Sequence, residues 1–246
     1  MNRKLFLLCM ALLPAIGYAQ KYKVRAIAAE RIEVTAALDT APHAAANAIV
    51  APYKHSVDSV MMPPLGMSRR AMQHGRPESL LGNWAADVMV ETSTATGLPR
   101  ADFGLMNVGG LRNTMPEGIV RTGDIMLISP FTNYVVVLEM KGSDVEELFR
   151  NIAAVHGEAV STEVRLEITR DGKLLRATVS GQPIDKERIY RVATIDYLME
   201  GNDKMFALKR HIKAHKMNIM ARDAMAESII KNKIIDSRIE GRITVK

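Results

Sequence analysis

The stretch FGLMNVGGLRNTMPEG, residues 103–118, decides how this chain is interpreted. It starts as an apolar strand and then passes through Asn107, two glycines and Arg112. Glycine pairs let the backbone turn where side chains do not fit, or let a ligand approach the main chain closely. The Arg112 guanidinium offers a planar set of donors that suits a phosphate or a carboxylate. Two interpretations are open at this point: a ligand-binding turn, or an ordinary turn with a solvated arginine.

The segments around this turn alternate between helix and strand patterns. Residues 78–97 have one apolar face and end at a glycine, which is typical of an amphipathic helix. Asp171-Gly172 is a turn sequence of β-hairpins. Strands are expected over residues 21–38, 102–108, 125–128, 134–140, 188–199 and 241–246, and helices over residues 41–62 (with a break at Pro52), 143–155 and 218–233. Hairpins and crossovers in one chain predict a mixed α/β (α+β) fold.

The first residues have the organisation of a secretory signal peptide. A basic start, RK at positions 3 and 4, precedes an apolar run over residues 5–16, and small residues lead up to Ala19. The run is shorter than the roughly 20 residues that a membrane-spanning helix needs. We therefore predict a secreted or periplasmic protein, cleaved after Ala19 and without stable membrane insertion afterwards. Residues 20–246 are expected to form a single domain, and the signal peptide pattern predicts that the natural N-terminus is present.

Composition and charge narrow the classes of function. The only cysteine, Cys9, lies within the predicted signal peptide, so no disulfide is expected in the mature protein. The formal charge is +6 for the whole chain and +4 without Arg3 and Lys4. This mild excess of basic residues is only weak support for anionic partners. No block of like charge indicates a nucleic-acid-binding arm, and we expect no nucleic acid partner.

The sequence lacks the signatures of a self-sufficient hydrolase. Of the six histidines, only His211 and His215 have a ligand-like spacing, and basic residues surround them. A solvated basic face explains this stretch better than a metal site. There is no Gly-x-Ser-x-Gly, no phosphate-binding P-loop and no dinucleotide fingerprint. We expect this chain to supply no catalytic residue and to bind no metal ion or other cofactor.

Aromatic and polar residues occur at two further junctions of strand and loop. Phe131 and Asn133 precede one expected strand, and Tyr197 ends another, with Asp203 six residues later. Each also has a structural interpretation: Phe131 as a core residue, Tyr197 as packing and Asp203 as a turn former. Together with the glycine turn they supply what a nucleotide requires, namely rings for the base, a carboxylate for sugar hydroxyls and a guanidinium for phosphate.

Five motifs in order resemble the C-terminal, substrate-binding domain of the bacterial and animal 5′-nucleotidases. They are RPESLLGNWAADVM, NVGGLR, SPFTN, EMKGSDVEELF and ATIDYLMEGNDKM. The resemblance extends over nearly the whole chain after the predicted cleavage site. It implies a four-layer α/β/β/α sandwich that holds the nucleoside part of a nucleotide.

The resemblance also implies roles for the glycine turn. The family's Asn-x-Gly-Gly-x-Arg turn falls on residues 107–112, so Asn107, Gly109 and Arg112 are implied as substrate contacts near the sugar and the phosphate. Upstream arginines bind phosphate in the family, and Arg76 is the nearest match here.

The other two junctions match the family less completely. Its two stacking aromatics fall on Phe131 and Tyr197, where the second is usually Phe, and a base contact of some members falls on Asn133. The carboxylate that receives ribose hydroxyls falls on Asp203. The usual Gly-Gly-Asp-Gly has become Gly-Asn-Asp-Lys at residues 201–204, which implies a different loop around the sugar.

The catalytic half of the family's enzymes has no counterpart in this sequence. They carry an N-terminal metallophosphoesterase domain with Asp-x-His and Gly-Asn-His-Asp signatures, and neither occurs here. The resemblance therefore implies a split enzyme, in which this chain presents a nucleoside 5′-phosphate to a separately encoded metallophosphoesterase subunit that binds divalent metal ions. The alternative is a non-catalytic periplasmic nucleotide-binding or scavenging module.

Overall fold

A computed structural model describes residues 23–35, 37, 43–95 and 97–246. The chain divides into two units, residues 1–50 and residues 51–246, with helix α2 (Ala44–Met61) running across the division. Residues 23–35 belong to no helix or strand, so the strand expected over residues 21–38 is not formed there. The predicted signal peptide and its cleavage site lie outside the described residues. Of the described helices, none combines the length and apolar character that crossing a bilayer requires.

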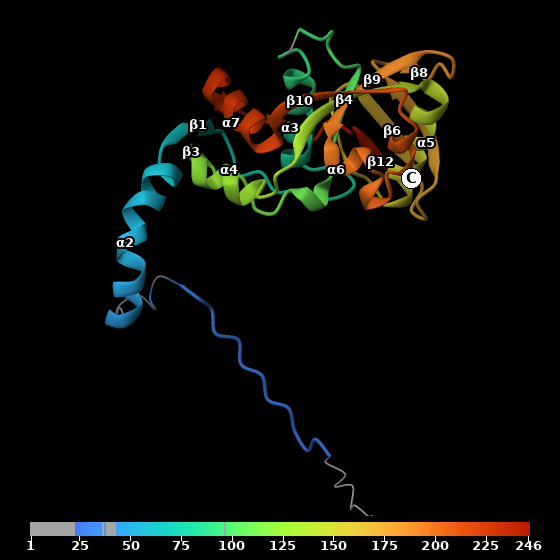
Figure 1. Cartoon of the computed structure of the whole chain (residues 1–246). Coiled ribbons are helices and arrows are strands. Elements are labelled where there is room, and N and C mark those ends of the chain that lie inside the picture. Colours follow the sequence, from blue (N-terminus) through green and yellow to red (C-terminus); the bar gives the residue numbers. More distant parts are fainter. Residues whose placement is uncertain (1–22, 36, 38–42, 96) are drawn as a thin grey trace, which may run out of the picture. The chain divides into compact units, whose positions relative to one another are not determined.

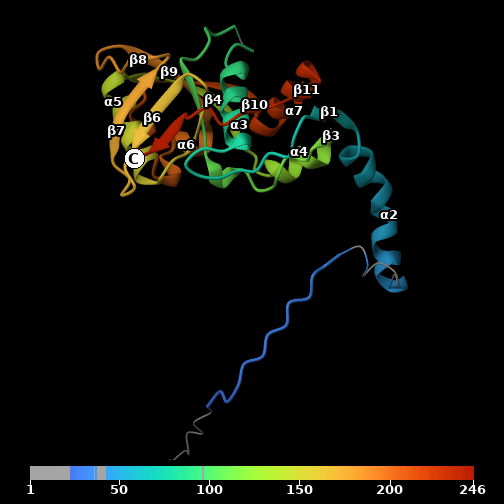
Figure 2. The same cartoon turned by 180° about the vertical axis from the view of Figure 1, so that it is seen from behind.

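The second unit is built around a five-stranded mixed sheet with the order β10-β4-β9-β2-β5 (Figures 1 and 2). Its strands are β2 (Phe103–Met106), β4 (Tyr134–Lys141), β5 (Ala159–Val160), β9 (Ile189–Ile195) and β10 (Lys213–Met220). Strand β9 is parallel to β2 and antiparallel to β4. The C-terminal ends of β2 and β9 and the N-terminal end of β4 therefore meet at one edge of the sheet.

Two helices cover opposite faces of this sheet. Helix α3 (Leu80–Thr92) lies so close to β2 that a Cβ atom on Gly104 would be 2.3 Å from the Ala86 carbonyl oxygen. On the neighbouring residue of β2, the Phe103 ring packs against Phe149 of helix α5 (Gly142–Ala154), with 5.3 Å between ring centroids. Because successive strand residues point to opposite faces, α3 and α5 lie on different sides of β2. Covered on both faces, the central strands are almost continuously apolar.

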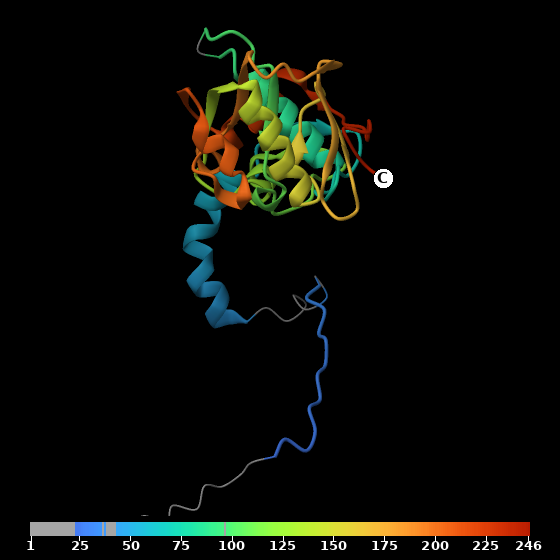
Figure 3. The same ribbon diagram turned by 90° about the vertical axis from the view of Figure 1, so that its right-hand side faces the viewer.

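Two smaller sheets complete the unit, and the yellow-to-orange hairpin of one of them lies near the C-terminus in Figure 3. Strands β1 (Pro64–Ser68), β3 (Gly118–Arg121) and β11 (Ile234–Ile235) form one, and β6 (Val164–Ile168), β7 (Leu174–Val179), β8 (Gln182–Pro183) and β12 (Ile243–Val245) form the other. The remaining helices are α4 (Thr122–Ile128), α6 (Asp196–Met199) and α7 (Ala221–Asn232), with 3₁₀ turns η3 (Val108–Gly110), η4 (Asn202–Lys204) and η5 (Phe206–Arg210). Strands β6 and β7 form the expected hairpin, and the mixed α/β class is confirmed.

A buried arginine fixes the segment that leads into β12 against α3. The Arg242 guanidinium, 3% exposed, donates two hydrogen bonds of 2.8 Å to the Asp87 carboxylate. It also donates to Glu240 and to the carbonyl oxygens of Asn83 and Val160. Burial raises the pKa of Asp87, although the bonds from Arg242 act in the opposite direction. Hydrogen bonds therefore hold the two side chains together in an environment where an unpaired charge would have a high desolvation cost.

Further segments also differ from the elements expected from the sequence. The strand expected over residues 125–128 is the second half of α4, because Asp124 accepts a hydrogen bond from the Arg121 main-chain N–H at 2.7 Å and caps a helix. A short apolar run does not distinguish the two structures by itself. The basic stretch at residues 213–220 forms strand β10, since it pairs with β4 along the sheet edge.

Candidate functional site

Seven of the eight substrate-binding residues expected from the sequence line one cavity of about 340 Å³. They are Asn107, Gly109, Arg112, Phe131, Asn133, Tyr197 and Asp203. They follow β2, precede β4 and follow β9, three strands that are neighbours in the five-stranded sheet. The strand order brings residues from three distant parts of the sequence to one sheet edge, which is a common position for ligand sites in α/β folds.

The Asp203 carboxylate lies at the centre of the hydrogen bonding in this cavity. Its Oδ2 atom accepts from the Asn107 side-chain amide at 2.7 Å, and its Oδ1 atom accepts from the Tyr197 hydroxyl at 3.1 Å. The same hydrogen bond raises the pKa of the Tyr197 phenol, because a neighbouring carboxylate disfavours the phenolate. One carboxylate thus joins the glycine turn to helix α6.

The glycine turn is shaped by the Asn107 side chain. Asn107 is 3% exposed, and a Cβ atom on Gly110 would be 2.5 Å from its Oδ1 atom, so any other residue at position 110 would have to displace the Asn107 side chain. Beside it, Gly109 has open space, with Asp203 Oδ2 the nearest atom to a notional Cβ at 3.8 Å. The exposed Arg112 donates to the Gly109 carbonyl oxygen at 3.3 Å, which keeps the guanidinium against the turn.

Arg76, the eighth expected residue, does not line the cavity. Its guanidinium donates to the Gly157 carbonyl oxygen at 2.7 Å and forms a close ion pair with Glu158. Glu158 is 1% exposed, and its other oxygen accepts from the Val108 main-chain N–H at 2.5 Å. Burial raises the pKa of Glu158 despite these bonds. Arg76 therefore supports the glycine turn from behind through Glu158, a residue that sequence reasoning did not single out.

The two rings of the cavity are both accessible. Phe131 is 46% exposed and Tyr197 is 39% exposed, so Phe131 is not a core residue. The Asp196 carboxylate accepts from the main-chain N–H groups of Tyr134 and Tyr197 at 3.0 and 2.8 Å. This bridge holds the start of β4, and with it Asn133, beside helix α6. Asp196 was also missed from the sequence, where it lies within the strand expected over residues 188–199, whereas residues 196–199 form helix α6.

The loop that carries Asp203 has a strained backbone. Gly201, Asp203 and Lys204 have φ values of 79°, 51° and 65°. Left-handed conformations cost a non-glycine residue on the order of 1 kcal/mol. Lys204 bears this cost at a position where the resemblance implies a glycine. The loop therefore keeps its conformation despite a less suitable residue, because Asp203 is held by two hydrogen bonds.

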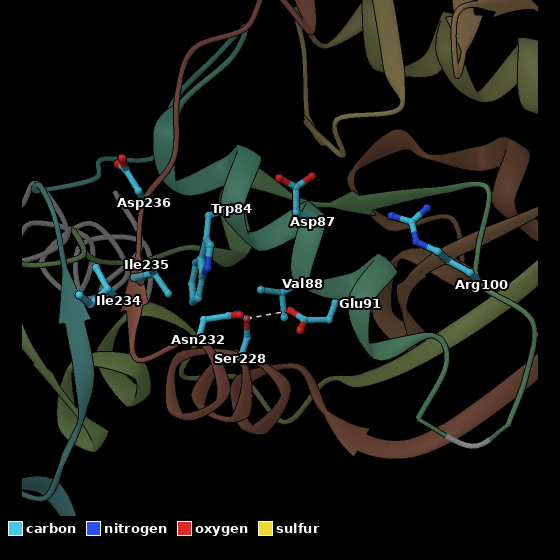
Figure 4. A pocket seen from close by; sticks show the side chains of 10 residues that line it. All are labelled: Trp84, Asp87, Val88, Glu91, Arg100, Ser228, Asn232, Ile234, Ile235 and Asp236. Carbon is cyan, nitrogen blue, oxygen red and sulfur yellow. Dashed lines mark hydrogen bonds between the residues drawn. The ribbon is translucent and has the colours of Figure 1, made fainter.

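A larger cavity of about 490 Å³ lies between α3, α7 and β11 (Figure 4). Its charged side chains already have partners: Asp87 pairs with Arg242, Glu91 with Lys231, Arg100 with Glu163 and Asp236 with Arg70. Ser228 also donates to Glu91, as the dashed line in Figure 4 shows. These groups stabilise the contact between elements, so size alone does not make this cavity the better candidate.

The described residues contain no cluster of three or more His, Cys, Asp or Glu side chains that could hold a metal ion. His215 lies on β10 with its Nε2 atom 2.9 Å from Glu139 Oε1 on β4, and His211 contacts the Leu208 carbonyl oxygen at 2.8 Å. The two histidines thus have separate partners.

A family model described as "5′-nucleotidase, C-terminal domain" matches residues 59–210, which is more than half of the chain. The chain belongs to this family. The 5′-nucleotidase C-terminal domain was the family expected from the five motifs, and the match confirms that expectation together with the fold.

Relatives agree with the family assignment. Protein UshA of Yersinia enterocolitica is 32% identical over 106 residues, which cover 42% of this chain and 19% of UshA. A 5′-nucleotidase of Vibrio vulnificus is 26% identical over 140 residues, or 56% of this chain and 25% of that protein. This chain thus spans about a fifth to a quarter of the length of these relatives.

Solved structures show the same fold. A 5′-nucleotidase precursor from Thermus thermophilus superposes with a TM-score of 0.73 at 23% identity, covering 81% of this chain and 43% of that one. The NAD nucleotidase of Haemophilus influenzae gives a TM-score of 0.64 at 19% identity, with 83% and 41% covered. The 5′-nucleotidase C-terminal domain fold therefore extends over most of the present chain.

Proposed function

We propose that this chain is the substrate-binding half of a split 5′-nucleotidase-type phosphohydrolase. It binds a nucleoside 5′-phosphate and presents the phosphate to a separate metallophosphoesterase subunit. The observation that carries the proposal is the convergence of two accessible rings, a carboxylate, an amide and an arginine on one cavity. Membership of the 5′-nucleotidase C-terminal domain family supports the same class of ligand.

Each group in the cavity has a proposed task. Phe131 and Tyr197 hold the base between their faces, since base–aromatic stacking contributes about 1–3 kcal/mol per base. Asp203 accepts from sugar hydroxyls, and Asn133 contacts the base edge. Arg112 orients the phosphate, because a guanidinium offers parallel donors to phosphate oxygens.

Asn107 and Arg76 act by positioning in this proposal. The Asn107 amide fixes the Asp203 carboxylate, and Gly109 leaves room for the ligand beside it. Arg76 acts through Glu158 on the glycine turn and does not contact phosphate itself. This is a change from the direct contact implied by the resemblance.

The bond-breaking step belongs to the partner. Divalent metal ions on the metallophosphoesterase would activate the water that displaces the nucleoside. Arginine and asparagine position a phosphate but do not lower the pKa of water as a metal ion does. The encounter would take place outside the cytoplasm, after export directed by the predicted signal peptide.

Reconstitution tests the proposal. The purified chain should bind AMP and show no turnover with Mn²⁺, Zn²⁺ or Co²⁺. Activity should appear on addition of the exported metallophosphoesterase recovered with this chain from the native cell envelope. Asp203→Ala should abolish that activity, whereas Asp223→Ala, on an exposed carboxylate of α7, should leave it unchanged.

The outcomes separate the alternatives. Metal-dependent hydrolysis by the chain alone would overturn the split arrangement. Tight AMP binding without any enzymatic partner would instead identify a non-catalytic nucleotide-binding module.

A further inference from the structure

Two very different donors hold the Asp203 carboxylate. The Asn107 amide is 3% exposed and donates at 2.7 Å. The Tyr197 hydroxyl belongs to a side chain that is 39% exposed, and it donates at 3.1 Å. Hydrogen bonds from a hydroxyl group to a carboxylate are normally about 2.5–2.7 Å. The Tyr197 bond is therefore long and open to exchange, while the Asn107 bond is short and enclosed.

The main chain of Tyr197 is fixed on both sides. Its N–H group donates to the Asp196 side chain at 2.8 Å, and its carbonyl oxygen accepts from the Asn202 side chain at 2.8 Å. Asn202 belongs to the same loop as Asp203, so helix α6 and the loop hold one another. Release of the Tyr197 hydroxyl consequently requires rotation of its side chain only.

We propose that the Tyr197 hydroxyl occupies, in the empty cavity, a place on Asp203 that a sugar hydroxyl takes when a nucleoside binds, and that this exchange frees the ring to stack on the base. The proposal rests on the proposed function and adds a selection step to it.

The chemistry of the exchange favours a ligand with two neighbouring hydroxyl groups. A vicinal diol donates one hydrogen bond to each oxygen of a carboxylate. Oδ2 keeps its bond from Asn107 and accepts one hydroxyl on its remaining lone pair, while Oδ1 exchanges phenol for the other hydroxyl. A sugar without hydroxyl groups provides no replacement, and the Tyr197 ring stays attached to Asp203. The pocket therefore selects ribonucleosides in two ways. The diol binds Asp203 directly, and it also releases the Tyr197 ring so that the ring can stack on the base.

Substitution of the hydroxyl alone provides the first test. Tyr197→Phe keeps the ring and removes the competing donor, so adenosine should bind about three- to tenfold more tightly, as loss of one ordinary competing hydrogen bond would give. If the hydroxyl instead supports Asp203 in the bound state, the same variant binds more weakly, and the exchange is wrong. An unchanged affinity also overturns it.

Tyrosine resonances provide the second test, because they report the phenol itself. In protein labelled with ¹³C at the tyrosine Cζ atom, Tyr197→Phe identifies the Tyr197 signal. Adenosine should move this signal and bring the pKa of Tyr197 down toward its ordinary value, whereas 2′,3′-dideoxyadenosine should not. Tyr190, whose buried hydroxyl accepts from the Asp185 main-chain N–H, is the internal control. A Tyr197 signal that responds equally to both nucleosides contradicts the exchange.

The same measurements distinguish the inference from the function on which it rests. If Asp203→Ala and Phe131→Ala leave adenosine binding unchanged, the nucleoside site itself is wrong. If those two variants weaken binding while Tyr197→Phe and the Tyr197 signal do not behave as described, only the exchange is wrong.

Discussion

At the scale of single residues, Phe131 has no task in the folded core that would explain its position. Phe131 is about half exposed and lines a cavity whose other lining groups are polar or charged except for Tyr197 and Gly109. A large exposed ring beside polar donors is expected where a ligand covers it.

Phe131→Ala should weaken adenosine binding by about 1–3 kcal/mol and leave the unfolding midpoint unchanged within error. Titration calorimetry measures the first and urea denaturation the second. Phe206→Ala is a matched control, because Phe206 is 61% exposed and lies outside the cavity lining. Equal effects of the two substitutions on affinity would show that Phe131 does not stack on the ligand.

The Glu158 carboxyl gives the protein a specific dependence on pH. Burial raises its pKa above the ordinary value of 4.5, so the folded protein binds this proton more tightly than the unfolded chain does. The bound proton therefore stabilises the folded state. This contribution is complete below pH 4.5 and is lost as the pH rises through the higher pKa that Glu158 has in the folded state. Urea denaturation between pH 4 and pH 7 should show this loss in the wild type and a flatter profile in Glu158→Gln. Parallel profiles would mean that Glu158 ionises alike in both states.

At the scale of elements, only one of the two glycines of the turn, Gly109, has room for a Cβ atom. Gly110→Ala would force its Cβ atom against the Asn107 amide, and overpacking of this kind typically costs about 1–3 kcal/mol. The displaced amide would also release Asp203, so adenosine affinity should fall as well. Gly109→Ala places its Cβ atom in open space and should change the free energy of unfolding by less than half as much. Chemical denaturation of the two variants measures the difference, and equal losses would contradict the geometry.

The elements also show what could be predicted from the sequence. The sequence patterns of helix α3 and of the β6–β7 hairpin are each compatible with one kind of element only, and both elements were predicted. The apolar run at residues 125–128 has the composition of a strand, but capping by Asp124 makes it helical. Strand β10 was missed because its alternation is weak and its position is set by pairing with β4.

Most of the candidate site could be predicted because its residues lie at the ends of strands, where the motifs mark them. Arg76 was different. Its partner Glu158 is 82 positions away, and nothing in the residues around either one indicates that they pair. Which arginine reaches the cavity is decided by tertiary packing.

At the scale of the whole molecule, one ion pair holds the segment before β12 in place. Arg242→Met would remove the partner of Asp87, whose side chain is 38% exposed, so the loss should be smaller than the roughly 3–5 kcal/mol typical of breaking a fully buried pair. Urea denaturation should show this decrease in the free energy of unfolding. Arg238→Met, four residues earlier on an exposed side chain, should cost far less. If both variants unfold at the same midpoint, the Arg242 contacts contribute little to stability.

The bond between Asn107 and Asp203 joins positions 96 apart in the chain, with most of the central sheet between them. Closing so long a loop costs chain entropy that is recovered only when the intervening strands have paired. We therefore expect the candidate pocket to form late in folding. A nucleoside bound there, as proposed, would contact only the structure that forms after the main folding barrier, so it should slow unfolding and leave the folding rate unchanged.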